Sequence, residues 1–464
     1  MSTFNGISTA LTSLYANRRG MEVTAHNIAN VNTPGYTRQR PNLQAIAGPA
    51  IPGLTSQASP VGDGVIVESV QRLRDIFLES RGRMEHAAAE YLGTQQTQLG
   101  RIEQTFAEPS DEALQAQLDE MWASFSDLSL RPNSTASRSA VLSRATIVAD
   151  TMRGNADQLA TQWDTGLSEL RAMVLEVNST TAAVAQLNEG IMAASAVGQQ
   201  PNDLMDQRDV LVMRLSELTG AKGVPQENGV TDVLLNGSVL VSGNSSRNIA
   251  PPTGALSLDA VKGGDLVALR FDEGPNYPSA APDSGRIAAM MQTLNHTIRT
   301  YSDGFDRVAS ELITSVNTQH ALGRDADGTP GGAFFGGTNA SDITVALTDP
   351  NDIAAADAGA TAGPLDGTNA QALAKLATKK DGPNERYREL IVNLGVAAQT
   401  VNRRVEIQAG VVTQSDAERE GDAGVSLDEE MTNMIQYERA YQAAARVIST
   451  VDTMLDTLIN GMGR

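Results

Sequence analysis

Apolar residues recur every seven positions at both ends of the chain, with mostly polar residues between them. The repeat runs over residues 427–462 at one end and over residues 7–28 at the other. This spacing is typical of helices that pair along a common seam, and it predicts one long helix at each end. The residues predicted to form the seam, and with it an assembly interface, are Ile7, Leu11, Leu14, Met21, Ile28, Leu427, Met434, Tyr441, Ile448, Val451, Leu455 and Leu458.

Neither terminal helix can bury its apolar stripe by itself. Leaving half a dozen large side chains in water forgoes roughly 10 kcal/mol of burial free energy. We therefore expect the two helices to pair with each other and with copies of themselves. The alternative is that both are ordinary core helices of one globular domain. Their position at the two ends of the chain, with the whole body inserted between them, argues against that alternative.

The body between the terminal helices is predicted to be mainly helical. Apolar spacings of three and four predict one helix over residues 72–107 and another after a cap at Ser110 or Asp111. Residues 133–194 contain no proline, which predicts either one very long helix or a helical pair. Further helices are expected over residues 201–219 and 286–320, and from Tyr387 into the C-terminal helix.

The pattern changes to short strands in the middle of the chain. Residues 231–235 and 238–241 flank Asn236-Gly237, a dipeptide that suits both positive φ angles of a type I′ hairpin turn. Residues 266–271 are predicted as a further strand. Residues 323–368 are rich in Gly, Ala, Asp and Thr, which predicts a long loop with one short strand.

These elements predict a mainly α fold with a small β insertion. Three domains are expected in the 464-residue chain. Residues 1–35 and 425–464 form an inner coiled-coil-like domain, residues 36–220 and 285–424 form a long helical rod domain, and residues 221–284 form a small β-rich outer domain.

Composition narrows the possible functions. The net charge of −20 argues against a nucleic-acid partner, because nothing concentrates Lys or Arg on one face. The absence of cysteine excludes disulfides, thiolate metal sites and thiol catalysis. The sequence contains no run of eighteen apolar residues, so no membrane span is predicted. The first residues lack the basic region and the apolar region of a classical signal peptide. A cytoplasmic protein and one exported by a specialised route both fit.

No motif predicts an active site, a metal site or a cofactor site, so we expect no enzyme. Residues 325–328 read Asp-Ala-Asp-Gly, but Thr329 and Pro330 stand where an EF-hand needs a ligand and a glycine, which favours a simple turn. Three carboxylates at residues 428–430 begin a predicted helix, where the macrodipole favours anions without catalysis. No histidine has a second histidine or a cysteine at the spacing of metal ligands. The histidines are His26, His86, His296 and His320.

Several segments resemble known protein signatures. Residues 27–36 (Asn-Ile-Ala-Asn-Val-Asn-Thr-Pro-Gly-Tyr) look like the N-terminal signature of the bacterial flagellar axial proteins, the superfamily of rod, hook and hook-associated subunits. Residues 434–448, which begin Met-Ile-Gln-Tyr-Glu-Arg-Ala-Tyr, resemble their C-terminal signature. The segments that are similar to the hook-associated protein 1 family, whose members join the hook to the filament, are residues 36–39, 202–209, 316–320, 334–335 and 424–430.

The resemblance implies a structural adaptor at the extracellular hook–filament junction. Such a protein is exported unfolded by the flagellar type III system, without a cleaved signal peptide, and assembles as a short helical layer whose terminal helices line an inner tube. The implied partners are copies of itself, the hook protein, the next hook-associated protein on the filament side, and a cytoplasmic export chaperone at the C-terminal helix.

Two alternatives stay open. One is a hook or rod subunit, which the motif at residues 202–209 disfavours. The other is a peptidoglycan hydrolase on an axial-protein framework. It would need a cleft with paired carboxylates, and residues 221–284 hold too few acids around a recognisable motif.

Overall fold

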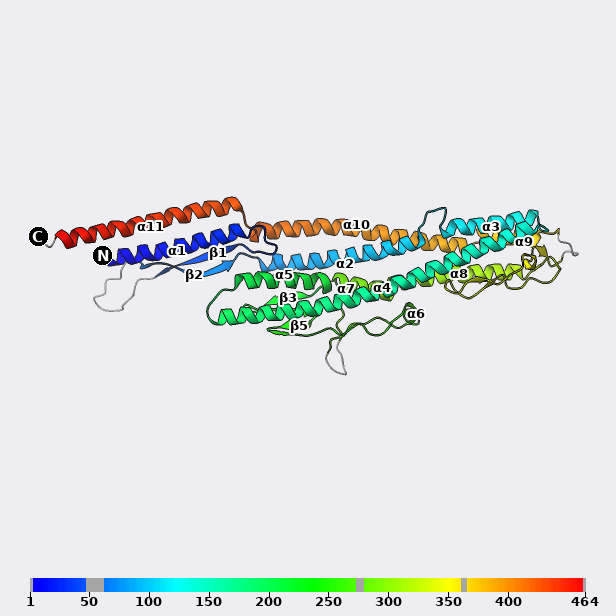
Figure 1. Cartoon of the computed structure of the whole chain (residues 1–464), viewed down its shortest axis with the longest axis horizontal. Helices are drawn as coiled ribbons and strands as arrows, with labels where there is room; N and C mark the ends of the chain where they lie inside the picture. Colours follow the sequence, from blue (N-terminus) through cyan, green and yellow to red (C-terminus); the bar gives the residue numbers. More distant parts are fainter. Residues whose placement is uncertain (1–2, 47–61, 273–278, 360–364, 462–464) are drawn as a thin grey trace. The chain divides into compact units, whose positions relative to one another are not determined.

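Long helices dominate the computed structural model, which describes residues 3–46, 62–272, 279–359 and 365–461. A few small antiparallel sheets complete it, so the mainly α fold with a small β insertion is confirmed. The long helices are α1 (Thr3–Ala29), α2 (Ile76–Phe106), α3 (Leu114–Leu130), α4 (Thr135–Ala196), α5 (Asn202–Thr219), α8 (Ile298–His320), α10 (Pro383–Ala423) and α11 (Leu427–Gly461) (Figure 1).

The chain divides into two compact units. Unit 1 comprises Met1–His86, Asn178–Asn248 and Gly410–Arg464, and unit 2 comprises Ala87–Val177 and Ile249–Ala409. Helices α2, α4 and α10 contribute residues to both units. Both terminal helices belong to unit 1. The division into three domains that the sequence suggests stays a prediction.

The terminal helices α1 and α11 lie side by side and antiparallel in unit 1 (Figure 1). Asn27 near the end of α1 meets Glu430 near the start of α11. Gly20 allows the close approach farther along, because a Cβ atom there would lie 2.7 Å from the ring of Tyr437. The predicted pairing of the two terminal helices is therefore confirmed.

A β-hairpin that the sequence pattern did not reveal follows α1. Strand β1 (Gln39–Ile46) pairs antiparallel with β2 (Gly64–Arg72), and β2 packs against α1. The prediction of a helix from residue 72 is therefore wrong at its start. Helix α2 begins at Ile76, because the Asp75 carboxylate accepts a hydrogen bond from the Phe77 amide at 2.6 Å and caps the first turn.

Helix α4 is continuous over 62 residues, which decides between the single long helix and the helical pair. Helix α5 ends at Thr219, and its C-cap is Gly220, whose left-handed φ of 73° favours glycine. The predicted cap of α3 at Ser110 or Asp111 is wrong. The Glu108 carboxylate accepts the hydrogen bond from the Gln115 amide at 3.0 Å instead.

A four-stranded antiparallel sheet follows α5 in unit 1. Asn236 and Gly237 form its predicted hairpin turn with φ angles of 44° and 82°. The predicted strand over residues 266–271 is wrong, since these residues form only isolated bridges. The facing segment contains Pro251 and Pro252, which have no amide hydrogen to donate. The strands of the sheet are, in spatial order, β3 (Lys222–Pro225), β4 (Thr231–Leu235), β5 (Ser238–Ser242) and β6 (Ser245–Ser246).

Unit 2 is built on a core of large aromatic side chains. The indole of Trp163 in α4 donates a hydrogen bond to the carbonyl of Leu294 at 3.0 Å. The ring of Phe305 packs against Phe106 and Tyr387, with centroids 5.3 and 6.3 Å apart. The helical run predicted over residues 286–320 is confirmed. It consists of α7 (Gly285–Gln292), the π-helical turn η1 (Thr293–Thr297) and α8.

Hydrogen bonds from side chains to the backbone hold the loop that follows α8. Arg138 donates to the carbonyl of Ile353 at 2.7 Å, Asn369 to that of Ala354 at 2.6 Å, and Asn317 to that of Phe335 at 2.8 Å. The remaining short elements of unit 2 are α6 (Leu258–Lys262), β7 (Gly323–Arg324), β8 (Phe335–Gly336), β9 (Thr344–Val345), η2 (Pro350–Asp352), β10 (Ala356–Asp357), α9 (Thr368–Ala374) and η3 (Lys375–Thr378).

Acid should destabilise unit 2 through His320. Its ring is fully buried, with Nδ1 donating to the carbonyl of Gly332 and Nε2 accepting from the amide of Ala354, both at 2.8 Å. Burial lowers the pKa of His320 below its usual value, although the bond to Gly332 opposes the shift. The unfolded chain therefore takes up a proton first, and stability is lost as the pH falls below about 6.5.

Thermal unfolding at about pH 7.5 and pH 5.5 measures this effect. His320→Gln should melt lower than the wild type at the higher pH but lose less stability on acidification. Equal losses in both proteins would show that His320 does not carry the acid sensitivity.

Candidate assembly interface

The predicted seam residues line the pair of α1 and α11, but the pair covers them only in part. The buried apolar positions in these helices are mostly small, as with Ala10, Ala16 and Ala444, and the large side chains of the predicted seam are less deeply buried. Three of the predicted seam residues are exposed, namely Leu11, Leu427 and Leu458. The others are partly buried, namely Ile7, Leu14, Met21, Ile28, Met434, Tyr441, Ile448, Val451 and Leu455. Apolar surface therefore remains for other chains to cover, and the role of these residues in assembly stays a prediction.

A buried polar cluster, the terminal junction (Asn27, Arg38 and Glu430), joins the two ends of the chain. Asn27 Nδ2 donates to Glu430 Oε2 at 3.0 Å and to the Gln39 carbonyl at 2.9 Å. Asn27 Oδ1 accepts from the Gln39 amide at 3.0 Å and from the Tyr36 hydroxyl at 2.7 Å. All the hydrogen-bonding capacity of this one side chain thus fixes the loop after α1 to the start of α11.

Arg38 completes the terminal junction. Its Nε donates to Glu430 Oε1 and its Nη1 to Glu429 Oε2, both at 2.7 Å. Only 2% of Glu430 is exposed, although most neighbouring residues of α11 face solvent. The interpretation of residues 428–430 as acids that merely complement the macrodipole is therefore incomplete. Charge-assisted hydrogen bonds offset the cost of burying Glu430.

Burial and, to a smaller extent, nearby negative charge keep the phenol of Tyr36 protonated. Burial raises the pKa of Tyr36, and the carboxylates of Asp206, Asp203 and Glu430 raise it further. The hydroxyl therefore keeps its proton, and it donates to Asn27 Oδ1 at 2.7 Å. This fixes the orientation of the Asn27 amide, whose Nδ2 is then directed to Glu430.

A carboxylate–arginine cluster (Arg72, Arg74, Asp206, Arg208 and Asp209) adjoins the terminal junction. Arg72 Nη1 donates to Asp206 Oδ1 at 2.7 Å and to Asp209 Oδ2 at 2.9 Å. Asp209 also pairs with Arg74 and, at 2.9 Å, with Arg208. The cluster thus ties α5 to the end of β2 and the residues that follow it.

The two carboxyls of the carboxylate–arginine cluster have pKa shifts in opposite directions. Burial raises the pKa of Asp206, and the hydrogen bond and charge of Arg72 offset this only in part. Burial also opposes the ionisation of Asp209, but Arg208, Arg74 and Arg72 together outweigh it and hold its pKa below the usual range. Asp209 is therefore the carboxylate whose charge the fold stabilises.

The structure brings together segments that the sequence presents as separate motifs. Residues 27–39, 202–209 and 424–430 all meet at these two clusters. The Thr37 amide donates to Asp206 Oδ2 at 3.1 Å, and the Arg38 amide donates to the carbonyl of Ala423 at 3.0 Å. The sequence motifs identify these segments, but nothing in the spacing of the motifs indicates that they contact one another.

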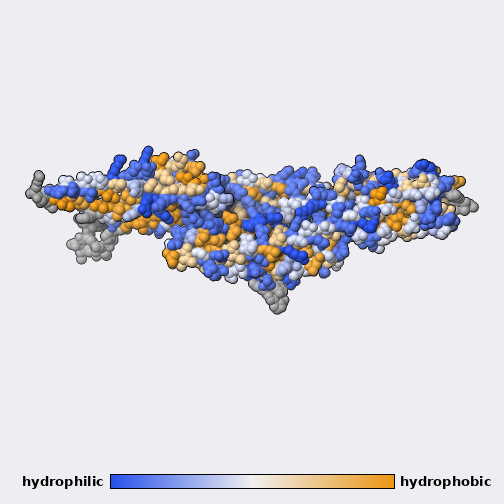
Figure 2. All heavy atoms as spheres, viewed as in Figure 1, coloured by the Kyte–Doolittle hydropathy of each residue, from blue (hydrophilic) through white to orange (hydrophobic). Residues whose placement is uncertain are grey.

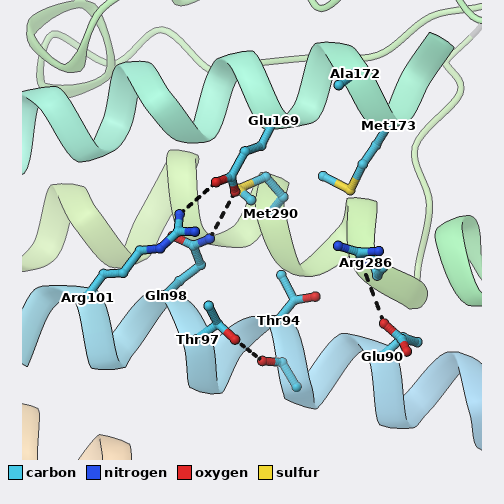
Figure 3. Close-up of a pocket in the computed structure, with 11 residues that line it drawn as sticks. Glu90, Thr94, Thr97, Gln98, Arg101, Glu169, Ala172, Met173, Arg286 and Met290 are labelled. Carbon is cyan, nitrogen blue, oxygen red and sulfur yellow. Dashed lines mark hydrogen bonds and ion pairs between the residues drawn. The ribbon is translucent and has the colours of Figure 1, made fainter. Parts of the chain in front are cut away.

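A groove in unit 2 lies between α2, α4 and α7 and encloses about 390 Å³ (Figure 3). Arg101 donates to Glu169 at 2.9 Å, and Arg286 lies 3.7 Å from Glu90. Both carboxylates of the groove are thus engaged by arginines, which does not suit the acid pair of a glycoside hydrolase.

The described residues do not form the calcium loop that residues 325–328 could suggest, or another metal site. Asp325 Oδ1 accepts from the amides of Asp327 and Thr329 at 2.9 and 2.8 Å, which confirms the turn. Within the described ranges, no three His, Asp or Glu side chains gather as a metal ion would require. No helix in those ranges is long and apolar enough to cross a membrane.

Three family models match the chain. Residues 99–335 match the flagellar hook-associated protein FlgK helical domain. Residues 7–37 match the flagella basal body rod protein model, and residues 422–461 match the flagellar basal body rod FlgEFG protein C-terminal model. The matched ranges include most of α1, all of α11 and most of unit 2.

Whole proteins match as well. The chain is 32% identical to flagellar hook-associated protein 1 of Bacillus subtilis, over 100% of this chain and 99% of that protein. It is 24% identical to flagellar hook-associated protein 1 of Salmonella typhimurium, over 98% and 99% of the two proteins. Its fold is similar to that of the flagellar hook junction protein FlgK from Burkholderia pseudomallei, with a TM-score of 0.63 and 16% identity, covering 75% of this chain and 100% of that one.

Proposed function

Since the chain belongs to the flagellar hook-associated protein 1 family, we propose that it is a structural adaptor that joins the hook of the bacterial flagellum to the filament. The family is one of structural flagellar proteins, so the chain is not an enzyme. The observation that carries the proposal is the 32% identity over the full length of a family member, with rod-type models matching both terminal helices. A peptidoglycan hydrolase is therefore excluded.

The terminal helices are the proposed assembly interface. Their large apolar side chains are only partly covered by the pairing of α1 with α11, and burying the rest against copies of the chain would stabilise a layer by about 25 cal/mol per Å². The proposed partners are copies of the chain, the hook protein, and the next hook-associated protein on the filament side. The proposed location is extracellular, reached through the flagellar type III system.

A deletion strain tests the junction role. Cells that lack the chain are expected to build complete hooks without filaments, and the tagged chain, supplied again, should appear only between hook and filament in electron micrographs. If the chain were a hook or rod subunit, its deletion would remove the hook itself. Filaments of normal length in the deletion strain would contradict the proposal.

We also propose that a cytoplasmic export chaperone binds α11 before assembly. Exposed apolar residues such as Met431, Ile435 and Met454 would promote aggregation, and an amphipathic helix suits a chaperone groove. A chain lacking residues 425–464 should lose measurable affinity for the chaperone in titration calorimetry. A chain lacking α1 is the control and should bind as the wild type does. Equal binding by both truncated chains would refute the assignment.

A further inference from the structure

Helix α11 exposes two apolar patches, which include Leu427 and Leu458, the two exposed seam residues of this helix. The proximal patch consists of Leu427, Met431 and Ile435 near the start of the helix. The distal patch consists of Val447, Met454 and Leu458 near its end. All six side chains are between 46% and 58% exposed. Figure 2 shows apolar atoms gathered over the first turns of α11 and again along the outer part of the α1–α11 pair.

The two patches lie on nearly opposite faces of α11. Successive residues turn by about 100° around a helix axis. Four half-buried residues define the side of α11 that faces α1. Around the helix axis, the proximal patch lies about 90° from that side in one sense, and the distal patch lies about 110° from it in the opposite sense. The four residues are Met434, Tyr441, Ile448 and Leu455.

One partner lying along α11 cannot cover both patches, because they face away from each other. Two partners can, one on each side of the pair. A closed two-fold dimer would need each patch to meet its own copy and would leave the second patch exposed. If one patch instead contacts the other patch of the next copy, the contact can repeat from copy to copy and does not close after two chains. A single type of contact then covers both exposed patches.

We propose that the proximal patch of each copy packs against the distal patch of the next copy, in a head-to-tail contact between staggered α11 helices. This inference rests on the proposed function and names the surfaces through which copies meet. The patch centres lie about 22 residues apart along α11, so neighbouring copies are displaced by about 33 Å along the helix axis.

Cysteine cross-linking tests this contact, since the chain has no cysteine of its own. Isolated flagella carrying M431C and M454C in one chain are treated with a short thiol cross-linker and run on a denaturing gel. A ladder of dimers, trimers and larger species is expected. Chains with only one of the two substitutions should stay monomeric. A second pair, I435C with L458C, repeats the test should the first pair impair assembly. The matched control pairs M431C with T453C, which turns the second thiol about 100° away from the distal patch.

Each outcome decides the inference. A ladder from the patch pairs alone supports it. Dimers from a single substitution would show that a patch meets its own copy, which overturns the head-to-tail contact. The absence of cross-links in flagella that contain the variants would show that the patches face something else. The proposed function is judged separately, by whether the wild-type chain is present in flagella at the hook–filament junction.

Discussion

Leu455→Asp is expected to abolish incorporation into the flagellum while leaving the melting temperature of the free chain nearly unchanged. Leu455 is only partly buried in the pair of α1 and α11, near the end of α11, so an aspartate there can keep its hydration. In the assembled layer the same position would be covered. Burying an unpaired carboxylate costs several kcal/mol, or forces its protonation. Thermal unfolding and recovery of the variant in isolated flagella measure the two effects.

The control for this prediction is Leu215→Asp in α5. Leu215 is fully buried in unit 1, with 0% of its surface exposed. A charge at that position should destabilise the free chain by about 4 kcal/mol or more and unfold the unit before any assembly. If the two variants lowered the melting temperature equally, the seam would be an ordinary core, and assembly would not be what buries it.

Asp209→Asn should be among the most destabilising substitutions in unit 1. It removes the carboxylate that Arg72, Arg74 and Arg208 share, leaving Asp206, which pairs with Arg72, as the one carboxylate of the cluster beside three guanidinium groups. Breaking a buried ion pair from one side costs about 3–5 kcal/mol. Asp209 is partly accessible, so a loss of about 3 kcal/mol is expected in urea unfolding. Asp203→Asn, on an exposed residue of the same helix, is the control and should cost less than about 0.5 kcal/mol.

The loss caused by Asp209→Asn should depend on pH. The pKa of the carboxyl is lowered in the folded chain, so its stabilising contribution is complete above about pH 4 and is lost as the pH falls through the folded pKa. The difference between wild type and variant should therefore shrink in strong acid. A difference that stays constant down to about pH 2 would mean that the charge of Asp209 contributes nothing to stability.

The sequence predicts the terminal helices well because their signal is local and repeated. Each heptad adds independent evidence, and two helices with complementary stripes have few other ways to bury them. The hairpin turn between β4 and β5 is predicted equally well, since Asn236-Gly237 favours one type of turn. In contrast, β1 shows alternating burial only at its start, where Gln39 and Pro41 are covered. A strand with so little periodicity cannot be distinguished from a loop.

The terminal junction could not be predicted, because its partners are far apart in the chain. Glu430 lies 392 residues from Arg38 and 403 residues from Asn27. At the start of a helix an acidic residue already has a local explanation in the macrodipole. The macrodipole alone explains such acidic residues in many proteins, so the sequence gives no reason to expect that Glu430 pairs with Asn27 and Arg38. A buried polar contact of this kind needs the fold before it can be recognised.

The hydrogen bond between Asn27 and Glu430 also constrains the order in which the chain can fold. Closing a loop of about 400 residues costs about 5 kcal/mol of chain entropy, so this contact gains little until the body between its partners is already compact. Glu430 follows Asn27 by 403 positions. A chain that is delivered gradually from its N-terminal end cannot form the contact until Glu430 has been delivered as well. The hydrogen bond between Asn27 and Glu430 is therefore among the last contacts that such a chain can form, and a chain that stops before Glu430 cannot form it.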